Sequence, residues 1–476
     1  MKDTIKNTYL AADFGGGSGR IIAGFLLHGK LELEEVHRFS NRQVKLGKHI
    51  YWDFPALFED MKTGLKLAAQ KGYTVKGIGI DTWGVDFGLI DKDGNLLGNP
   101  VCYRDARTEG MPAKVFRLLN ECQHYDETGI QVMAINTLFQ LYSMKQNQDA
   151  QLEVARQLLF MPDLFSYFLT GVANNEYCIA STSELLDARV RNWSLDTIHA
   201  LGLPEHLFGE IIFPGTIRGA LKEDIARETG LGAVDVIAVG SHDTASAVAA
   251  IPASENPIAF LSSGTWSLLG VEVDEPILTE EARKAQFTNE GGIDGKIRFL
   301  QNITGLWILQ RLMSEWKASG EEQDYDIIIP QAAEAKIETI IPVDDETFMN
   351  PESMEATLMN YCRNHTLQIP QNKAETVRCV LQSLAFKYRQ AVEQLNRFLP
   401  SPIRQLNIIG GGSQNKLLNQ LTADELGIPV YAGPVEATAM GNILTQAMAK
   451  GEIADLRELR EIVTHSVTPQ IYYPKK

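Results

Sequence analysis

The stretch AADFGGGSGR, Ala11 to Arg20, contains four glycines in ten residues and joins two apolar runs. The first run covers Tyr9–Ala12 and the second covers Arg20–Leu27, and each is typical of a buried strand. Glycine relaxes the steric limits on backbone angles, so a glycine-rich link between two strands indicates a tight turn. The sequence therefore predicts a strand–turn–strand unit at the start of the chain.

This glycine turn does not match the two common phosphate-binding loops. The chain contains no GxxxxGK[ST] motif, which excludes a P-loop NTPase. Arg20 stands where the last glycine of GxGxxG belongs, and a strand rather than a helix is predicted to follow. A dinucleotide-dependent oxidoreductase is therefore excluded. Both a plain hairpin turn and a phosphate-binding hairpin remain compatible with this stretch alone.

Length and charge describe an ordinary globular protein without a nucleic-acid partner. The chain has 476 residues, of which 44 % are hydrophobic and 22 % charged, and this length suggests two domains. Its 44 basic and 60 acidic residues leave a formal charge of −16. Binding of nucleic acid needs clustered lysine and arginine, so we expect none. A phosphorylated small molecule needs only a local site.

The cysteines and the N-terminal segment predict a cytoplasmic location. The five cysteines are scattered and form no CxxC pair, which argues against zinc and thioredoxin chemistry and suits a reducing compartment. The N-terminal residues lack the apolar core of a signal peptide. No apolar run reaches the roughly 18 residues of a membrane span. We therefore expect a cytoplasmic protein with no membrane partner.

The pattern of the opening stretch recurs in the second half of the chain. PIAFLSSGTWSLLGVEV, residues 257–273, again runs from an apolar strand through a small polar turn to a second strand. A third loop, Gly410–Ser413, follows an apolar run and precedes a helix that we expect to end at Gly427. Alternating strands and helices in both halves predict an α/β protein. Turn residues at 251–257 suggest a boundary between two domains, 1–247 and 248–476.

Further elements are predicted from hydrophobic patterning. Residues 234–250, VDVIAVGSHDTASAVAA, predict a buried strand that leads into a helix. Two more strands are expected at Gly77–Asp81 and Phe87–Asp91. The expected helices are Asn136–Gln146, Leu152–Leu169 and about Glu436–Lys450.

Three glycine loops in this order are a more specific signal than any one of them. The turn Ser262–Ser267 adds hydroxyls and backbone donors that suit phosphate oxygens. The glycines at 410–412 let the backbone pass close to a flat ligand such as a nucleoside. This arrangement resembles the actin-like ATPase fold, in which two related domains each present a phosphate hairpin to one nucleotide.

Within that fold, the chain from Tyr9 to about Lys450 resembles the FGGY carbohydrate kinases. The blocks that carry the resemblance are IDTWGVDFGLID (80–91), YRDART (103–108), MPDLFSYFLTG (161–171), SHDTASAV (241–248), LSSGTWSLLG (261–270), TNEGG (288–292), QNITGLWILQR (301–311), GGGSQNKLLNQL (410–421) and GPVEATAMGNI (433–443). They are most similar to the rhamnulokinase branch, because other branches differ at Thr82–Asp86. In one departure, Gly16 and Gly17 stand where relatives often carry a small residue and a hydroxyl, and Ser18 with backbone N–H groups is expected to compensate.

The resemblance implies both a fold and a reaction. The fold would be two actin-like ATPase (ribonuclease H-like) α/β domains with the active site in the cleft between them. The reaction would be phosphorylation of L-rhamnulose at its 1-hydroxyl by ATP with Mg²⁺, giving L-rhamnulose 1-phosphate and ADP. Closure of the domains on the sugar would exclude water, which otherwise hydrolyses ATP. We expect a monomer or a weak homodimer.

Two aspartates are the expected chemical centre. Asp243 follows a buried strand at the start of a helix, and residue type alone would also explain it as a helix cap. The resemblance makes it the catalytic base that accepts the proton of the attacking sugar hydroxyl. Asp13 ends the first strand and would also suit a turn. The resemblance favours a magnesium role for it through water, so Asp13 and Asp243 are the expected metal-associated residues.

The other candidate residues are assigned by the same resemblance. The expected nucleotide contacts are Gly16, Gly17, Ser18, Gly19, Arg20, Thr265, Gln310 and Gly411. The expected sugar contacts are Trp83, Gly84, Asp86, His242, Asp243, Thr244 and Asn302. An aromatic face beside a carboxylate suits a sugar, although Trp83 in the core and Asn302 as a helix cap would be ordinary structural residues. Asp105 and Arg107 are weaker candidates, which an internal ion pair would explain equally well.

Two other functions fit parts of this sequence. A ketose kinase for another sugar, such as L-fuculose or L-xylulose, would need only small changes at Trp83–Asp86. A sugar-sensing regulator of the same fold without chemistry would be expected to lose one of the two aspartates or to gain a DNA-binding segment. The chain keeps Asp13 and Asp243 and has no basic appendage, which favours the enzyme.

Overall fold

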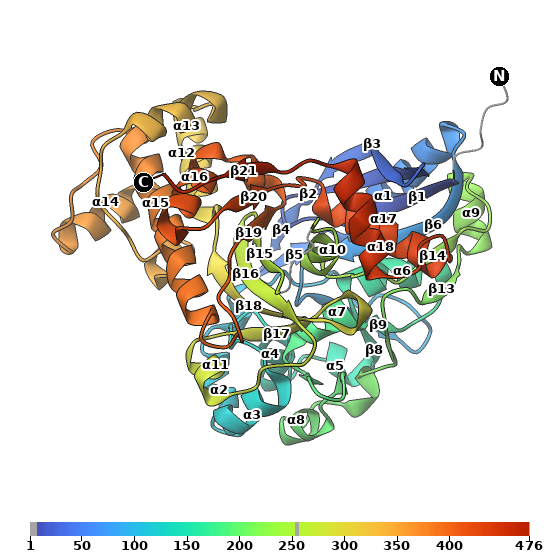
Figure 1. Cartoon of the computed structure of the whole chain (residues 1–476). Helices are drawn as coiled ribbons and strands as arrows, with labels where there is room; N and C mark the ends of the chain where they lie inside the picture. The colour runs from blue at the N-terminus through green and yellow to red at the C-terminus, as the bar shows by residue number, and fades with distance from the viewer. Residues whose placement is uncertain (1–6, 253–256, 476) are drawn as a thin grey trace. The chain divides into compact units, whose positions relative to one another are not determined.

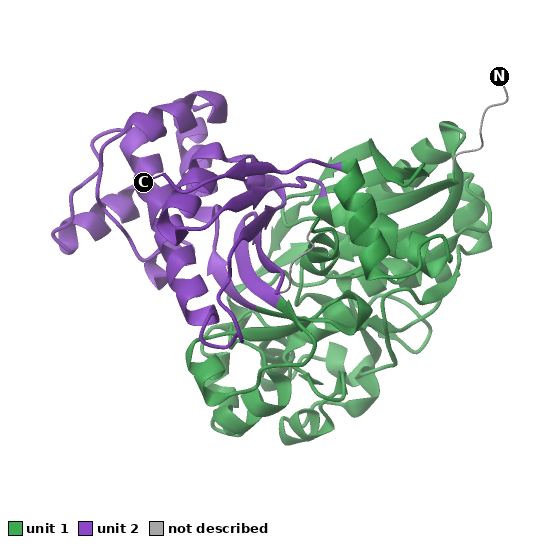
Figure 2. Ribbon diagram, viewed as in Figure 1, with its two compact units in different colours: residues 1–253, 272–299, 437–466 green, residues 254–271, 300–436, 467–476 purple. Residues whose placement is uncertain are grey.

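The computed structural model of the chain describes residues 7–252 and 257–475 (Figure 1). Its contacts divide the chain into two compact units, which Figure 2 draws in different colours. Unit 1 contains residues 1–253, 272–299 and 437–466, and unit 2 contains 254–271, 300–436 and 467–476. Strands and helices alternate in both units, and the predicted α/β class is confirmed.

The central sheet of unit 1 has six strands in the order β13-β14-β6-β1-β2-β3. Strand β1 pairs in parallel with β6 and antiparallel with β2, so the opening hairpin lies in the middle of the sheet. Every residue of β1 after Asn7 is buried, as expected for a strand covered on both faces. The strands are β1 (Asn7–Phe14), β2 (Ser18–Leu27), β3 (Lys30–Ser40), β6 (Thr74–Thr82), β13 (Ile217–Ala220) and β14 (Asp235–Ile237).

Helices cover both faces of this sheet. On one face, α1 approaches β2 so closely that a Cβ on Gly64 would lie 2.2 Å from Ile21. On the other, α17 lies against β1 and β6, where a Cβ on Gly79 would lie 2.3 Å from Asn442. Glycine is required at Gly79 because a larger residue would separate strand and helix. The helices packed around the sheet are α1 (Phe54–Gln70), α6 (Met161–Thr170), α9 (Glu223–Thr229), α10 (Asp243–Ala249), α17 (Ala437–Ala449) and α18 (Leu456–Ser466).

A second part of unit 1 is built around a smaller pair of strands. Strand β7 (Phe87–Asp91) pairs antiparallel with β8 (Ala155–Phe160), and α4 (Thr137–Gln146) packs into the same apolar core. The predicted strand at 87–91 and the predicted helix at 136–146 are confirmed.

The predicted helix over 152–169 is wrong. Residues 152–154 belong to the short helix α5 (Gln151–Val154), residues 155–160 form β8, and α6 begins only at Met161, with Pro162 in its first turn. Residues 158–165 are all buried and, apart from Asp163, apolar, so hydrophobic periodicity could not separate the end of the strand from the start of the helix. The proline was the local signal for the helix start, since its missing N–H is tolerated there.

The sheet of unit 2 carries the second predicted hairpin. Within this unit the strand order is β18-β16-β15-β19-β20-β21, and β15 pairs antiparallel with β16 but in parallel with β19. The predicted helix stop at Gly427 is also confirmed. The strands are β15 (Ala259–Ser263), β16 (Trp266–Val273), β18 (Ile297–Thr304), β19 (Leu406–Ile409), β20 (Val430–Ala432) and β21 (Gln470–Tyr472). The larger helices are α12 (Trp307–Ala318), α13 (Tyr325–Glu334), α14 (Met354–Asn364), α15 (Lys373–Leu395) and α16 (Lys416–Leu426).

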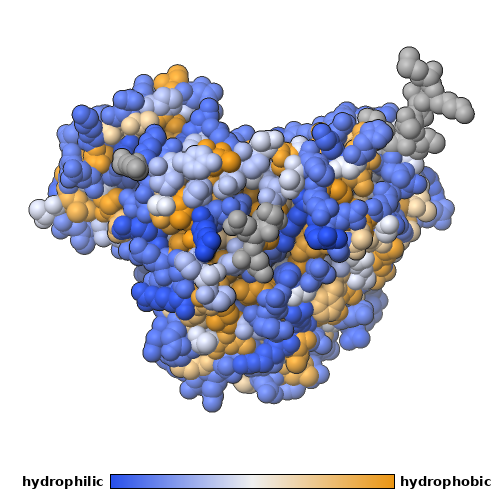
Figure 3. Space-filling view, viewed as in Figure 1, coloured by the Kyte–Doolittle hydropathy of each residue, from blue (hydrophilic) through white to orange (hydrophobic). Residues whose placement is uncertain are grey.

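The surface of the chain mixes hydrophilic and hydrophobic residues on the face drawn in Figure 3. Among the residues that the structure describes, no helix has both the length and the apolar character to cross a membrane.

Candidate active site

The glycine turn of unit 1 is a hairpin whose tip is free of side chains. Gly15 N–H donates to the Ser18 carbonyl at 2.9 Å, which closes the turn. Gly16 and Gly17 are exposed, and a Cβ on Gly17 would meet nothing within 4 Å. Gly19 differs, because a Cβ there would lie 2.3 Å from the Phe39 ring. The structure therefore gives Gly19 a packing role and leaves the backbone at the tip accessible to a ligand.

Asp13 and Arg20 face each other at the base of this hairpin. They are paired in the β1–β2 register, and Arg20 Nη2 donates to Asp13 Oδ2 at 2.5 Å. The Arg20 side chain is 18 % exposed and that of Asp13 is 9 % exposed. The register of a tight hairpin thus fixes a carboxylate and a guanidinium beside the open turn.

A second carboxylate, Asp81, lies next to Asp13 and was missed in the sequence analysis. Asp13 and Asp81 are paired in the parallel register of β1 and β6. Asp81 is fully buried: its Oδ2 accepts from Asn442 Nδ2 at 2.5 Å, whereas its Oδ1 accepts no hydrogen bond. Burial raises the pKa of Asp81 well above its ordinary value, and the Asp13 carboxylate adds to the rise.

The predicted base, Asp243, is the first residue of α10. Its Oδ1 accepts from the Thr244 N–H at 2.5 Å and from the Thr244 hydroxyl at 3.1 Å. Its side chain is 32 % exposed, so it is within reach of a ligand. Desolvation raises the pKa of Asp243, His242 opposes the rise, and the Asp13 carboxylate adds to it. Asp13, Asp81 and Asp243 therefore lie in one electrostatic neighbourhood.

His242 is held by two buried charged residues that the sequence analysis did not assign. Its Nδ1 lies 3.2 Å from Glu290 Oε2 and 3.1 Å from Arg298 Nη2, while its Nε2 lies 3.5 Å from Asp243 Oδ1. The Arg298 side chain is completely buried and Glu290 is nearly so. Glu290 belongs to TNEGG (288–292), one of the blocks that carry the family resemblance, but the sequence alone assigns it no function. The arrangement fixes the imidazole and directs Nε2 toward Asp243.

Trp83 and Asp86, two predicted sugar contacts, belong to a buried polar cluster. The Trp83 ring packs on Trp52 at a centroid distance of 4.2 Å. Asp86 is fully buried, and its carboxylate accepts four hydrogen bonds from within the protein. The donors are Trp52 Nε1 at 2.6 Å, Trp83 Nε1 at 3.0 Å, Tyr103 N–H at 3.1 Å and Gln140 Nε2 at 3.0 Å. Burial raises the pKa of Asp86 to about 6, and these donors limit the rise.

The backbone beside this cluster is strained. Gly84 is half-buried, and a Cβ there would meet Thr182 at 3.2 Å. Val85 has a φ of +67°, which is unfavourable for a β-branched residue. Thr182 Oγ1 accepts from Val85 N–H at 3.1 Å, and Thr137 Oγ1 donates to the Val85 carbonyl at 2.7 Å. Buried hydroxyls thus hold the Trp83–Asp86 block in one shape.

Three predicted nucleotide contacts lie in unit 2. Thr265, at the tip of the β15–β16 hairpin, donates its hydroxyl to Gln310 Oε1 at 3.0 Å. The Gly410–Gly412 loop packs on the base of the same hairpin, because a Cβ on Gly412 would lie 2.0 Å from Ser263 Oγ. Gly411 is exposed, with nothing within 4 Å of a Cβ. The structure therefore brings Thr265 and Gln310 together and places the glycine loop against their hairpin.

The structure excludes the helix-cap explanation of Asn302. It lies inside β18, and α12 begins five residues later at Trp307, after its cap Leu306. Gln310 lies in the first turn of α12.

The carboxylates of unit 1 fit a magnesium ion that takes most of its ligands from elsewhere. Among the described residues, no group of three or more His, Cys, Asp or Glu side chains is arranged to hold a metal. Magnesium commonly uses only one or two carboxylates and completes its shell with water and substrate phosphates. Asp13, with the partly exposed carboxylate of Asp243 nearby, fits that need.

The fold of the chain is that of sugar kinases. A xylulose kinase from Lactobacillus acidophilus superimposes with a TM-score of 0.82 at 15 % sequence identity, covering 98 % of this chain and 94 % of that one. The predicted actin-like ATPase fold class is confirmed by this similarity.

The sequence comparisons identify the family. The model of the N-terminal domain of the FGGY family of carbohydrate kinases matches residues 8–250, and the C-terminal domain model matches 259–450. The chain belongs to the FGGY family of carbohydrate kinases. It is 46 % identical over 472 residues to a rhamnulokinase from Bacteroides thetaiotaomicron, covering 99 % of this chain and 96 % of the relative. A rhamnulokinase from Oceanobacillus iheyensis is 42 % identical over 460 residues, with 96 % of each covered.

Proposed function

We propose that this chain is an ATP-dependent kinase that phosphorylates L-rhamnulose at its 1-hydroxyl, with L-rhamnulose 1-phosphate and ADP as products. Full-length similarity to proteins named rhamnulokinase supports the substrate. The observation that best supports the proposal is that two carboxylates, Asp243 and Asp13, and the guanidinium of Arg20 lie together beside an open glycine turn. Phosphoryl transfer depends mainly on positioning and charge neutralisation, and this set supplies both.

The roles of the residues follow from their contacts. Asp243 accepts the proton of the attacking hydroxyl, and Thr244 holds the carboxylate by two hydrogen bonds. His242, fixed by Glu290 and Arg298, positions the sugar. Trp83 and Gly84 present the sugar surface, which Asp86 supports from behind, and Asn302 is a further proposed sugar contact.

The nucleotide is assigned to groups in both units. The backbone at Gly16 to Gly19, with Ser18 and Arg20, binds phosphate oxygens. Thr265, Gln310 and Gly411 bind the nucleotide from unit 2. Magnesium, held through Asp13 with Asp243 nearby, would neutralise phosphate charge. We further propose that domain 1–247 binds the sugar and carries the first phosphate loop, and that domain 248–476 binds the nucleotide. The protein would be cytoplasmic and would exist as a monomer or a weak homodimer.

The decisive test measures ADP release with MgATP and each of L-rhamnulose, L-fuculose and L-xylulose, against a blank without sugar. We expect the fastest release with L-rhamnulose. Faster release with another ketose would keep the kinase and replace its substrate. ATP binding without sugar-dependent release from any ketose would favour the sensor.

A further inference from the structure

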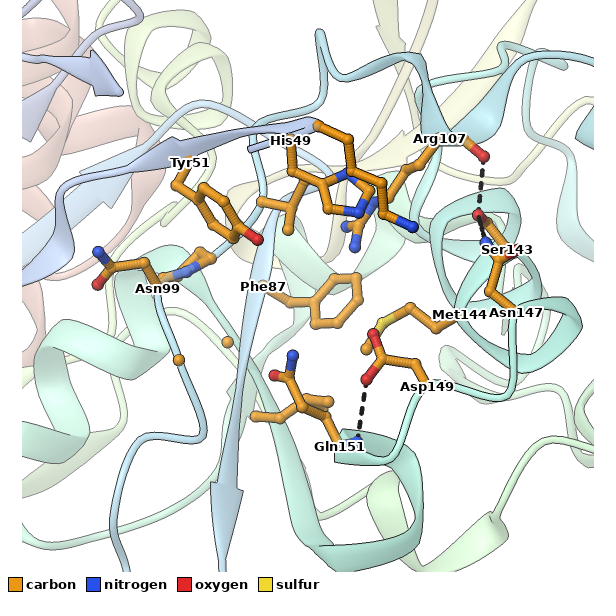
Figure 4. A pocket seen from close by; sticks show the side chains of 16 residues that line it. His49, Tyr51, Phe87, Asn99, Arg107, Ser143, Met144, Asn147, Asp149 and Gln151 are labelled. Carbon is orange, nitrogen blue, oxygen red and sulfur yellow. Dashed lines mark hydrogen bonds between the residues drawn. The ribbon is translucent and has the colours of Figure 1, made fainter. Parts of the chain in front are cut away.

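A cavity in unit 1 lies beside the Asp86 cluster and contains none of the expected nucleotide or sugar contacts, although Arg107, one of the two weaker candidates, lines it. It has a volume of about 280 Å³, just below the roughly 300 Å³ at which typical ligand pockets begin. Figure 4 shows Phe87 at its centre, with His49 and Tyr51 on one side and the end of α4 on the other. Its lining comes from β5 (His49–Trp52), β7, residues 98–101 and residues 143–151.

Arg107, at the wall of this cavity, is a cation without a carboxylate partner in the described part of the chain. An internal ion pair with Asp105 would have explained both residues, but the structure does not contain it. Asp105 instead binds His49 Nδ1 at 2.9 Å and accepts from the backbone N–H groups of Ile50 and Arg107. The Arg107 guanidinium donates to Gln140 Oε1 at 2.6 Å, and its buried Nε has no hydrogen-bond partner.

An unpaired guanidinium of this kind is costly for the protein. Burial lowers the pKa of Arg107, and the more distant Asp86 and Asp105 oppose the change. A buried donor without an acceptor costs about 1–3 kcal/mol, and more when it is charged. An anion that draws the guanidinium into the cavity would remove that cost, because a phosphate or carboxylate accepts the parallel N–H groups of arginine.

The other residues that line the cavity indicate what the rest of an anionic ligand would be. Lys48 adds a second positive charge. Asp149, the one carboxylate of the lining, accepts from the Gln151 N–H at 3.0 Å, and its negative charge opposes the lowering of the Arg107 pKa, as Asp86 and Asp105 do. The apolar floor suits the carbon face of a carbohydrate, and the amides suit its hydroxyls. The floor is formed by Phe87, Leu89, Val101 and Met144, and the amides are Asn99, Asn147 and Gln151.

We propose that this cavity is a second binding site, which takes a small polyhydroxylated anion. Arg107 binds its phosphate or carboxylate, and the amide side chains bind its hydroxyls. A sugar phosphate and a sugar acid share this chemistry, and both fit a cavity of this size.

The site is connected to the proposed sugar site by two hydrogen bonds. Arg107 donates to Gln140 Oε1, and Gln140 Nε2 donates to Asp86 Oδ1 at 3.0 Å. Asp86 in turn holds the indole N–H groups of Trp52 and Trp83. An anion that draws Arg107 into the cavity would alter this chain, so we expect its binding to change the affinity for the sugar, a step that rests on the proposed function.

Binding is tested by calorimetric titration of the full chain with three probes of one carbon skeleton: D-sorbitol, D-gluconate and D-sorbitol 6-phosphate. We expect both anions to bind at least about tenfold more tightly than sorbitol, because hydrogen bonds to charged groups contribute more than neutral ones. The comparison of gluconate with sorbitol 6-phosphate identifies the preferred anionic group. Equal affinity for all three, or no binding, would overturn the proposal.

Three variants locate the bound anion. Arg107→Met should weaken anion binding by about tenfold or more. Asn99→Trp fills the cavity from an exposed position and should weaken all three probes, whereas Arg156→Met, an exposed arginine outside the cavity, should change nothing. Binding that survives Asn99→Trp but is lost in His242→Ala would place the anion in the active centre and refute the second site.

The connection is tested separately with steady-state kinetics. At a saturating anion concentration we expect the KM for L-rhamnulose to change in the wild type but not in Asn99→Trp. The same KM shift in both proteins would show competition at the active centre and refute the connection. Absence of any turnover with L-rhamnulose would contradict the proposed function and leave the titration result intact.

Discussion

Asp243 is the first residue of α10 and not its cap, which is His242. Its carboxylate accepts from the N–H and the hydroxyl of Thr244, the next residue, whereas a capping side chain accepts from an N–H two or three residues further on. The structure therefore rejects the capping explanation, and the side chain remains 32 % exposed and available to a ligand. The residue that distinguishes this site from an ordinary helix start is Asp13, whose carboxylate raises the pKa of Asp243 from a neighbouring strand.

Asp243→Asn tests the base at the residue scale. The amide keeps the shape and the acceptor oxygen for Thr244 but cannot take up a proton. We expect kcat to fall by roughly 10²–10⁴-fold with nucleotide binding retained, measured by ADP release and by MgADP titration. Turnover similar to the wild type would reject the assignment of Asp243 as base.

Asn442→Leu tests the buried carboxylate next to Asp13. The change removes the donor to Asp81 Oδ2 and leaves both oxygens of that side chain without a partner. We expect the free energy of unfolding to fall by about 1–3 kcal/mol in denaturant titrations. The matched control is Asn360→Leu on the surface of α14, which should have little effect; an equal loss in both variants would contradict the explanation.

At the scale of elements, a buried glutamate connects α7 (Tyr177–Ala180) to the catalytic loop, the short segment at Ser241 that leads into α10 and Asp243. Glu176 caps α7 by accepting from the N–H groups of Cys178 and Ile179, and its Oε2 also accepts from Ser241 N–H at 3.1 Å. Ser241 in turn accepts from Thr82 N–H at the end of β6. One side chain thus fixes the position of the catalytic loop relative to the central sheet.

Glu176 also makes stability depend on pH. Burial raises its pKa from 4.5 to about 7, so between these values the folded chain keeps a proton that the unfolded chain releases. Its contribution to stability is present below about pH 4.5 and is lost as the pH rises through 7. In Glu176→Gln the difference in unfolding free energy between pH 5 and pH 8 should shrink by about 1–3 kcal/mol.

The control for this prediction is Glu461→Gln, at an exposed position on α18. Denaturant titrations at both pH values should give the wild-type difference for this variant. An unchanged pH difference in Glu176→Gln would show that Glu176 ionises normally in the folded state.

The elements differ in how far the sequence predicts them. Both hairpins follow from local chemistry, because a glycine turn between apolar runs specifies strand, turn and register together. The segment 152–169 was misassigned because a buried strand and a buried helix are equally apolar. Asp81 escaped notice because its significance depends on Asn442, 361 residues further along the chain. Glu290 and Arg298 act only through His242, and no local pattern marks such a cluster.

At the scale of the whole molecule, the proposed nucleotide contacts are divided between the two units. Gly17 of unit 1 and Gly411 of unit 2 both have free space where a side chain would begin. Gly17→Val and Gly411→Val should therefore fold normally but hinder the ligand. MgADP at about 100 times its Kd should stabilise the wild type by about 2.7 kcal/mol, and each variant should lose most of this gain.

Thermal unfolding with and without MgADP measures this effect. Asp243→Asn serves as the matched control, because it should keep the stabilisation while it loses turnover. Full stabilisation of Gly411→Val would remove that loop from the proposed nucleotide site, and the same result for Gly17→Val would remove the first turn.

The position of α17 has a consequence for biosynthesis. This helix lies against β1 and β6 and supplies Asn442 to Asp81, although Asn442 follows Asp81 by 361 residues in the chain. At roughly 5–20 residues per second, the ribosome needs on the order of 20–70 s to make the chain between these two partners. During that interval the nascent sheet exposes an uncovered face and an unmatched carboxylic acid. Unit 1 can complete its core only after α17 has emerged, so the growing polypeptide depends on protection from aggregation until then.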